Sequence, residues 1–178
     1  MLRNILLNES EKTYSIAERL FTFISNDELN WTPAEGKNWM TVGQLLMHCS
    51  AFGCGKAIQG FVKGDWGLHD GKTIEELIES DHTPSVEELP RVKSVEAAIE
   101  LLKEDKKLTI NCLKEVDEAR LLSEHLKAPW GGEVLPLFHH LLQMIVHLVH
   151  HKGQLYYYIK LMGKNVSSND LWEVNNAK

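Results

Sequence analysis

The sequence predicts an all-α protein that folds as a four-helix bundle, with a long crossover between its second and third helices. Apolar residues recur at the three-and-four spacing of an α-helix in four long segments, and Gly and Pro gather between these segments. No segment shows a clear alternation typical of a β-strand. Two of the connections are short, whereas residues 64–93 form a connection long enough to run back along the bundle. Helices 2 and 3 can therefore run in parallel.

The first two helices follow from apolar stripes and one N-cap. Before the first proline, Pro33, helix 1 carries a stripe at helical spacing that comprises Tyr14, Ala17, Leu20, Phe21 and Ile24. Thr41 can cap helix 2, which we expect to continue without a break to near Gly64. The inward face of helix 2 would comprise Val42, Leu45, Cys49 and Phe52.

The last two helices follow the long connection, in which residues 73–80 can form a short helix. Ser94 is the expected N-cap of helix 3, which extends to about Val116. Helix 4 runs from about Val134 to Leu161 and is apolar on nearly all sides, which exceeds what one core-facing stripe requires. We therefore expect helix 4 to lie at the centre of the bundle or to form an interface as well.

The composition is that of a soluble globular protein, with 43% apolar and 25% charged residues. We expect one domain over residues 1–178, with a core of about residues 2–163 and a C-terminal tail of residues 164–178. The net charge of −6 and the lack of a Lys/Arg cluster argue against a nucleic-acid partner, and no apolar run is long enough to cross a membrane. The N-terminus lacks a secretory signal, so a cytoplasmic location is the default expectation.

The three cysteines argue against a disulfide framework and against a cysteine-type zinc ribbon. They are odd in number and contain no C-x-x-C pair. We expect Cys54 and Cys112 to be buried as small hydrophobic residues. Cys49 lies about 100° around the helix from its neighbour His48, so we expect it to pack in the core rather than to bind a metal.

Histidines are concentrated in the segment "IVHLVHHKGQLYYYIK" of helix 4. His147 and His151 are four residues apart, about 40° around the helix axis and about 6 Å along it, so both side chains can point at one spot. His140 lies about 10.5 Å from His147 along the axis. That separation is too large for both side chains to bind one zinc ion at about 2.1 Å.

A third ligand for such a metal has to come from another helix. His48, in "LLMHCS", is the only other histidine on a predicted helix that faces the core. A pair at this spacing can also arise by chance, with His150 and His151 at a surface and each ring hydrogen-bonded to a neighbour. Leu148 stands where a zincin-type protease carries its catalytic Glu, so a protease of that type is excluded.

The segment "HLVHHKGQLYYYIKLMG", together with "NWMTVGQLLMH" and "LLMHCSAFG" about a hundred residues upstream, resembles the DinB-like (YfiT-like) superfamily of metal-dependent bundles. The resemblance extends from about Leu2 to Gly163, and its most specific parts are the helix 2 histidine and the H-x-x-x-H-x-G-Q pattern. It implies an up-down-down-up four-helix bundle, usually a homodimer. It also implies a metal triad that maps onto His48, His147 and His151.

The expected cofactor is a divalent metal ion. Three neutral histidines leave a coordination position open, as in catalytic zinc sites, but imidazole also suits other metals. Zinc or nickel is expected first, and iron or manganese is also compatible. Gln143 and Gln154 lie one turn on either side of the histidine pair and could hydrogen-bond to the ligands or be ordinary polar residues at a bundle edge. Trp130 could line the mouth of a pocket or pack against the bundle.

Two functions follow from the resemblance. The first is an enzyme of the thiol-dependent S-transferase type, which would use a low-molecular-weight thiol and a small-molecule substrate, because a metal can deprotonate a thiol bound to it. The alternative is a stress-associated protein that binds a metal or a small ligand without turnover. Spacing alone places no carboxylate on the histidine face, so the catalytic residues remain unassigned.

Overall fold

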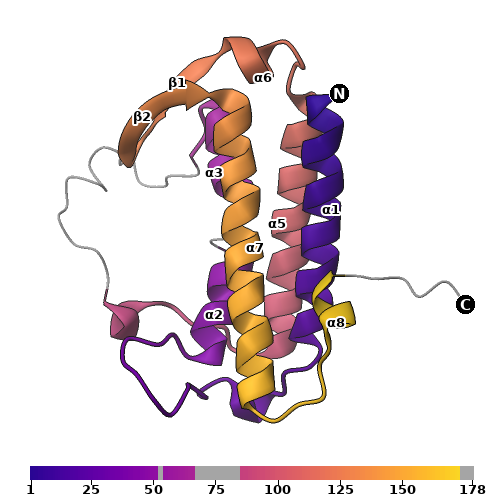
Figure 1. Ribbon diagram of the computed structural model, residues 1–178. Helices are drawn as coiled ribbons and strands as arrows, with labels where there is room; N and C mark the ends of the chain where they lie inside the picture. Colours follow the sequence, from indigo (N-terminus) through magenta and orange to yellow (C-terminus); the bar gives the residue numbers. More distant parts are fainter. Residues whose placement is uncertain (52–53, 67–84, 173–178) are drawn as a thin grey trace, which may run out of the picture.

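The chain forms a mostly helical bundle with a small β-hairpin at one end (Figure 1). The computed structural model describes residues 1–51, 54–66 and 85–172. The long elements are α1 (Leu2–Phe21), α2 (Val42–Ser50), α3 (Gly55–Lys63), α5 (Val95–Glu115) and α7 (Leu137–Leu161). In Figure 1, α1 and α7 run downward, whereas α2, α3 and α5 run upward. The helix α5 therefore runs in the same direction as α2 and α3.

The core lies between α1, α5, α7 and the pair formed by α2 and α3. Both α5 and α7 contact α1 on one side and α2 and α3 on the other. Each helix buries one apolar stripe, which is the main source of stability for helices of this length. The central side chains with 2% or less of their surface exposed include Tyr14, Phe21, Leu45, Leu113, Leu141 and Tyr158.

The third predicted helix is confirmed as α5, and its first turn has the expected cap. The Ser94 side chain accepts a hydrogen bond from the backbone N–H of Ala97 at 3.1 Å, which satisfies one of the free donors at the helix start. The helix ends at Glu115, one residue before the predicted end. The first helix, α1, begins at Leu2, well before the predicted stripe of Tyr14 to Ile24. It ends at Phe21, so Ile24 lies beyond the helix.

The prediction of an unbroken second helix is wrong. The structure has two helices, and α3 begins at Gly55 with an aspartate from α5 at its N-terminus. The carboxylate of Asp105 accepts hydrogen bonds from the backbone N–H groups of Cys54 at 3.2 Å and of Gly55 at 3.0 Å. A helix start needs such acceptors because its first N–H groups have no partner within the helix. A side chain fifty residues away thus sustains the break after α2.

The all-α prediction also needs correction, because residues 125–136 form an antiparallel hairpin. Its strands are β1 (His125–Ala128) and β2 (Gly131–Pro136). Gly131 and Gly132, the first two residues of β2 after the turn, have φ angles of +97° and +94°, a backbone region that side-chain-bearing residues avoid. The fourth helix therefore begins at Leu137 rather than at Val134, with Pro136 as its N-cap residue.

Shorter elements complete the described chain. They are the 3₁₀ turns η1 (Asn26–Glu28) and η2 (Val86–Glu88) and the short helices α6 (Arg120–Ser123) and α8 (Ser168–Trp172). Part of the predicted tail is folded, since α8 packs on α1 and the Lys152 ammonium group donates a hydrogen bond to the Leu171 carbonyl at 3.2 Å. The predicted helix at residues 73–80 lies outside the described residues. Within the described segments, no helix combines the length and apolarity that a membrane crossing requires.

Candidate metal centre

His48 is presented by α2, whose start is fixed by a reciprocal cap. The Thr41 side chain accepts the backbone N–H of Gln44 at 3.2 Å, while the Gln44 side chain accepts the backbone N–H of Thr41 at 2.8 Å. Such a capping box stabilises a helix by about 1 kcal/mol. Leu45 and Cys49 are buried on the inner face of α2. His48 lies at the edge of this buried face, half-buried and directed toward α7.

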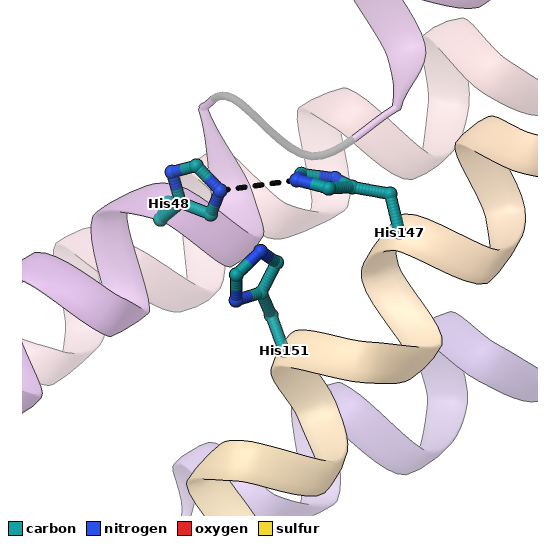
Figure 2. Close-up of side chains that lie close together, drawn as sticks. All are labelled: His48, His147 and His151. Carbon is teal, nitrogen blue, oxygen red and sulfur yellow. Dashed lines mark hydrogen bonds between the residues drawn. The ribbon is translucent and has the colours of Figure 1, made fainter. Parts of the chain in front are cut away.

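The two helix 4 histidines meet His48 from α7. Figure 2 shows the His147 and His151 rings one turn apart, with the His48 ring facing both. The ring centroid of His48 lies 5.0 Å from that of His147 and 4.3 Å from that of His151. The two α7 rings are 4.6 Å apart. The structure therefore brings together the three histidines that the sequence analysis selected.

The distances between these nitrogens are compatible with one metal ion. One ligand atom from each histidine lies within 4.8 Å of the other two, and the Nε2 atoms of His48 and His147 are 3.1 Å apart. Two nitrogens that each bind a tetrahedral ion at about 2.1 Å lie about 3.4 Å from each other. A shift of a few tenths of an ångström would therefore suffice at this pair. The three-histidine cluster could hold a metal ion.

The electrostatics of the cluster favour neutral imidazoles, which is the form that binds metals. The pKa of His48 is lowered to about 4, mainly because burial disfavours the charged ring and further because His151 and His147 lie close to it. Burial also lowers the pKa of His151, while the hydrogen bond with Gln154 opposes this effect. At neutral pH His48 and His151 are thus uncharged, and each keeps one ring nitrogen whose lone pair can bind a metal.

The cluster contains histidine alone. Among the described residues, no Asp, Glu or Cys joins the three ligand atoms. A set of three neutral protein ligands keeps the full charge of a divalent ion and leaves room for a further ligand, which is the pattern of catalytic rather than structural zinc sites. The donor chemistry fits zinc, nickel and iron equally, so it leaves the identity of the metal open.

His140, which the sequence analysis excluded from a shared metal site, and His150 both lie outside the cluster. His140 is buried, its Nε2–H donates to the Leu126 carbonyl at 2.8 Å, and its ring stacks on Phe61 at 4.5 Å. His150 is exposed to solvent. All three cysteines are buried as predicted, and burial raises the pKa of the Cys49 thiol to about 12, so this thiol stays protonated in the core.

The two glutamines flanking the pair have different environments. Gln143 is exposed, whereas the Gln154 side chain accepts a hydrogen bond from Nδ1 of His151 at 3.2 Å. Gln154 also donates to the hydroxyl of Tyr158 at 3.3 Å. The sequence analysis did not select Tyr158, although its position seven residues after His151 places it on the same face of the helix.

Trp130 packs at the hairpin end of the bundle. It is 51% exposed, and its ring makes edge contacts with Phe61 at 5.6 Å and with Trp66 at 6.1 Å between centroids. The distances support the packing role that was one of its two expected roles. These ring contacts place Trp130 against Phe61 and Trp66 rather than against the histidine cluster.

Comparison with known proteins agrees with the fold. The chain is similar to the crystal structure of YjoA, a DinB-like protein from Bacillus subtilis, with a TM-score of 0.63 and 17% identity over 90% of this chain and 94% of that one. It is also similar to a DinB-like protein from Bacillus cereus, with a TM-score of 0.62 and 16% identity over 91% and 93% of the two chains. At this identity the likeness concerns the fold alone.

No curated protein matches the chain. The sequence model of the DinB superfamily, however, matches residues 9–155, which include all three histidines of the cluster. This match spans well over half of the 178 residues. The chain belongs to the DinB superfamily.

Proposed function

We propose that His48, His147 and His151 hold one divalent metal ion and that the protein is a metal-dependent transferase, which joins a low-molecular-weight thiol to a small electrophile. The convergence of three imidazoles from two helices carries this proposal, and burial keeps at least His48 uncharged at neutral pH. Zinc or nickel is the preferred metal, and iron or manganese is also compatible with the ligands. The choice of a thiol rests on the resemblance to the superfamily.

The residues of this chain would bind and orient the metal rather than move protons. A divalent metal at this position would supply Lewis-acid chemistry, which lowers the pKa of a thiol that binds it. In the transfer itself, the sulfur forms a bond to the electrophilic carbon while the leaving group departs with the bonding electron pair, and the thiol proton passes to solvent. No carboxylate of the described residues joins the cluster, so the mechanism assigns no general base to this chain.

A second function is favoured by the same lack of acid–base residues. A protein that only stores or senses a metal, or a small ligand bound to it, needs the three histidines and nothing else. The alternative is therefore a stress-associated binding protein without turnover. The two functions differ in one measurable quantity, which is the rate of thiol transfer by the metal-loaded protein.

We also propose that the protein is a homodimer. The outer face of α7 carries apolar side chains that the bundle leaves uncovered, with 37% of Val146, 64% of Tyr157 and 64% of Leu161 exposed. Apolar surface on the outer face of a bundle helix is typical of an interface between subunits. A persistent dimer would have to bury well above about 1,000 Å² in total.

Thiol transfer is tested with protein purified without a histidine tag and loaded with zinc or nickel. The protein is incubated with a panel of cellular thiols and a chromogenic electrophile, and His147→Ala is compared with His150→Ala. We expect the rate to fall to background in His147→Ala and to stay at the wild-type level in His150→Ala, because His150 is exposed outside the cluster.

Two outcomes would contradict the transferase proposal. Equal rates in wild type and His147→Ala would show that the cluster takes no part. A metal-loaded wild type without transfer for any thiol in the panel, and with a cobalt-substituted spectrum that thiols leave unchanged, would support the binding protein instead.

A further inference from the structure

A chain of three hydrogen bonds runs from the histidine cluster to the backbone before α2. His151 Nδ1 lies 3.2 Å from Gln154 Oε1, Gln154 Nε2 lies 3.3 Å from the Tyr158 hydroxyl, and that hydroxyl lies 3.1 Å from the Met40 carbonyl oxygen. Met40 directly precedes Thr41, the N-cap of the helix that carries His48. These hydrogen bonds therefore link α7, which carries His147 and His151, to the start of α2, which carries His48.

The direction of each bond is fixed from the Met40 end. A backbone carbonyl can only accept, so the Tyr158 hydroxyl donates its one hydrogen to Met40. The hydroxyl oxygen is then an acceptor, and the Gln154 group beside it must be the NH₂ donor. The amide oxygen of Gln154 consequently faces His151 and can only accept, so Nδ1 of His151 carries the proton.

A reversed Gln154 amide would lose one of these bonds. The Tyr158 hydrogen would then have two acceptors, the Gln154 oxygen and the Met40 carbonyl, and could serve only one of them. One hydrogen bond favours the observed direction by roughly fivefold to tenfold. The Tyr158 side chain has no room to turn away, since it is 2% exposed and the Trp31 and Trp39 rings contact it edge-on at 5.4 and 6.1 Å.

We propose that Gln154 and Tyr158 are positioning residues, which hold His151 as the Nδ1–H tautomer and keep its Nε2 lone pair directed into the cluster. Figure 2 shows one His151 ring nitrogen pointing toward the other two rings and the second pointing away from them. Partners of this kind orient metal-binding histidines in many proteins. The consequence for metal binding rests on the proposed function, whereas the tautomer is a property of the metal-free protein.

The tautomer is tested by NMR of the imidazole ring nitrogens in ¹⁵N-labelled, chelator-treated protein at pH 8. The His151 signals are identified by their loss in His151→Gln. In wild type we expect Nδ1–H to be the dominant form. In Tyr158→Phe both directions of the Gln154 amide make one bond to His151, so the preference for the Nδ1–H tautomer, roughly fivefold to tenfold in wild type, should fall to about one. Tyr157→Phe is the matched control, because Tyr157 is exposed and takes no part in this chain of hydrogen bonds.

A second variant tests the same logic without removing the tyrosine. In Gln154→Glu the side chain can only accept, so the Nδ1–H form of His151 should persist. A wild-type His151 protonated on Nε2, or a Tyr158→Phe tautomer ratio equal to that of wild type, would overturn the proposal. The wild-type measurement alone decides the point if a variant fails to fold.

Metal affinity supplies the second readout, from competition with a chromogenic chelator. We expect Tyr158→Phe to bind the metal about tenfold more weakly than wild type and Tyr157→Phe to bind equally well. If wild type binds no metal while His151 is still the Nδ1–H tautomer, the proposed function fails and the positioning role of Gln154 and Tyr158 stands. If wild type binds metal and His151 is a mixture of both tautomers, the positioning role of Gln154 and Tyr158 fails and the metal centre of the proposed function stands.

Discussion

One added methyl group at Gly55 should destabilise the protein, because α3 and α5 touch at this residue. A Cβ atom there would lie 2.5 Å from the Asp105 carboxylate oxygen Oδ1 and 2.8 Å from the Asp105 backbone oxygen. The carboxylate could rotate away, but the backbone oxygen could move only if the two helices separated. Forced overpacking costs about 1–3 kcal/mol, and loss of the aspartate cap costs about 1 kcal/mol.

The gain that opposes this cost is small. Alanine is favoured over glycine in a helix by at most about 1 kcal/mol. The net effect of Gly55→Ala should therefore be a loss of about 2 kcal/mol in the free energy of unfolding. Gly153, in α7, is the matched control, because nothing lies within 4 Å of an added Cβ atom and its φ angle is not positive. Gly153→Ala should stabilise the protein by about 1 kcal/mol.

Calorimetry of the metal-free protein in a chelating buffer measures both variants. For a chain of this size, 1 kcal/mol corresponds to about 2–4 °C in Tm, so Gly55→Ala should lower Tm by about 4–8 °C and Gly153→Ala should raise it by about 2–4 °C. Each sample is measured at two protein concentrations, which separates changes in self-association from changes in folding. A Tm of Gly55→Ala equal to or above that of wild type would refute the explanation of the helix break by contact with Asp105.

Three further predictions concern acid stability, assembly and the buried polar network. The unfolded chain protonates His48 near pH 6.5 but the folded chain only near pH 4, so the free energy of unfolding of the metal-free protein should decrease as pH falls through this window. In urea titrations at several pH values, His48→Gln should reduce the slope of this free energy against pH, whereas His150→Gln, at an exposed position, should leave the slope unchanged. Sedimentation at tens of micromolar should return a dimer that Tyr157→Glu dissociates, and a monomeric wild type would remove the homodimer proposal. The Tyr14 hydroxyl is buried and hydrogen-bonded to the Asp105 carboxylate at 2.5 Å and to Cys54 Sγ and Thr109 Oγ1 at 2.9 Å each. Tyr14→Phe deletes this hydroxyl and should cost about 1–3 kcal/mol, so an unchanged urea midpoint would contradict the importance of this network.

The cluster could be predicted from the sequence because its geometry is local on one helix. The spacing of His147 and His151 fixes their relative direction once α7 is helical, whatever the rest of the fold. The prediction of His48 as the third ligand needed the further assumption that its helix packs beside α7. The apolar pattern of "TVGQLLMHCS" supported this assumption. The length of the connection at residues 64–93 allowed helices 2 and 3 to run in parallel, whereas the full up-down-down-up order and the membership of the superfamily depended on the resemblance.

The parts that the sequence did not reveal depend on contacts between distant residues. The break after α2 is stabilised by Asp105, which accepts a hydrogen bond from the backbone N–H of Gly55, fifty residues away. In the sequence, Asp105 looks like an ordinary charged residue of its own helix. Tyr158 gains its role through the carbonyl of Met40, 118 residues away. The hairpin was missed because β1 has only four residues, too few for their alternating exposure to be recognised, and β2 has six residues without an alternation of buried and exposed side chains.

Metal content per chain tests the three-histidine centre most directly. Protein purified without a histidine tag is loaded with zinc or nickel, freed of excess metal and measured by elemental analysis, for wild type and for alanine variants of His48, His147, His151 and the exposed His150. One ion per chain is expected in wild type and in His150→Ala, and none in the other three variants. Loss of the metal in His150→Ala with retention in His151→Ala would contradict the ligand assignment, and a wild type that retains no metal would contradict the centre itself.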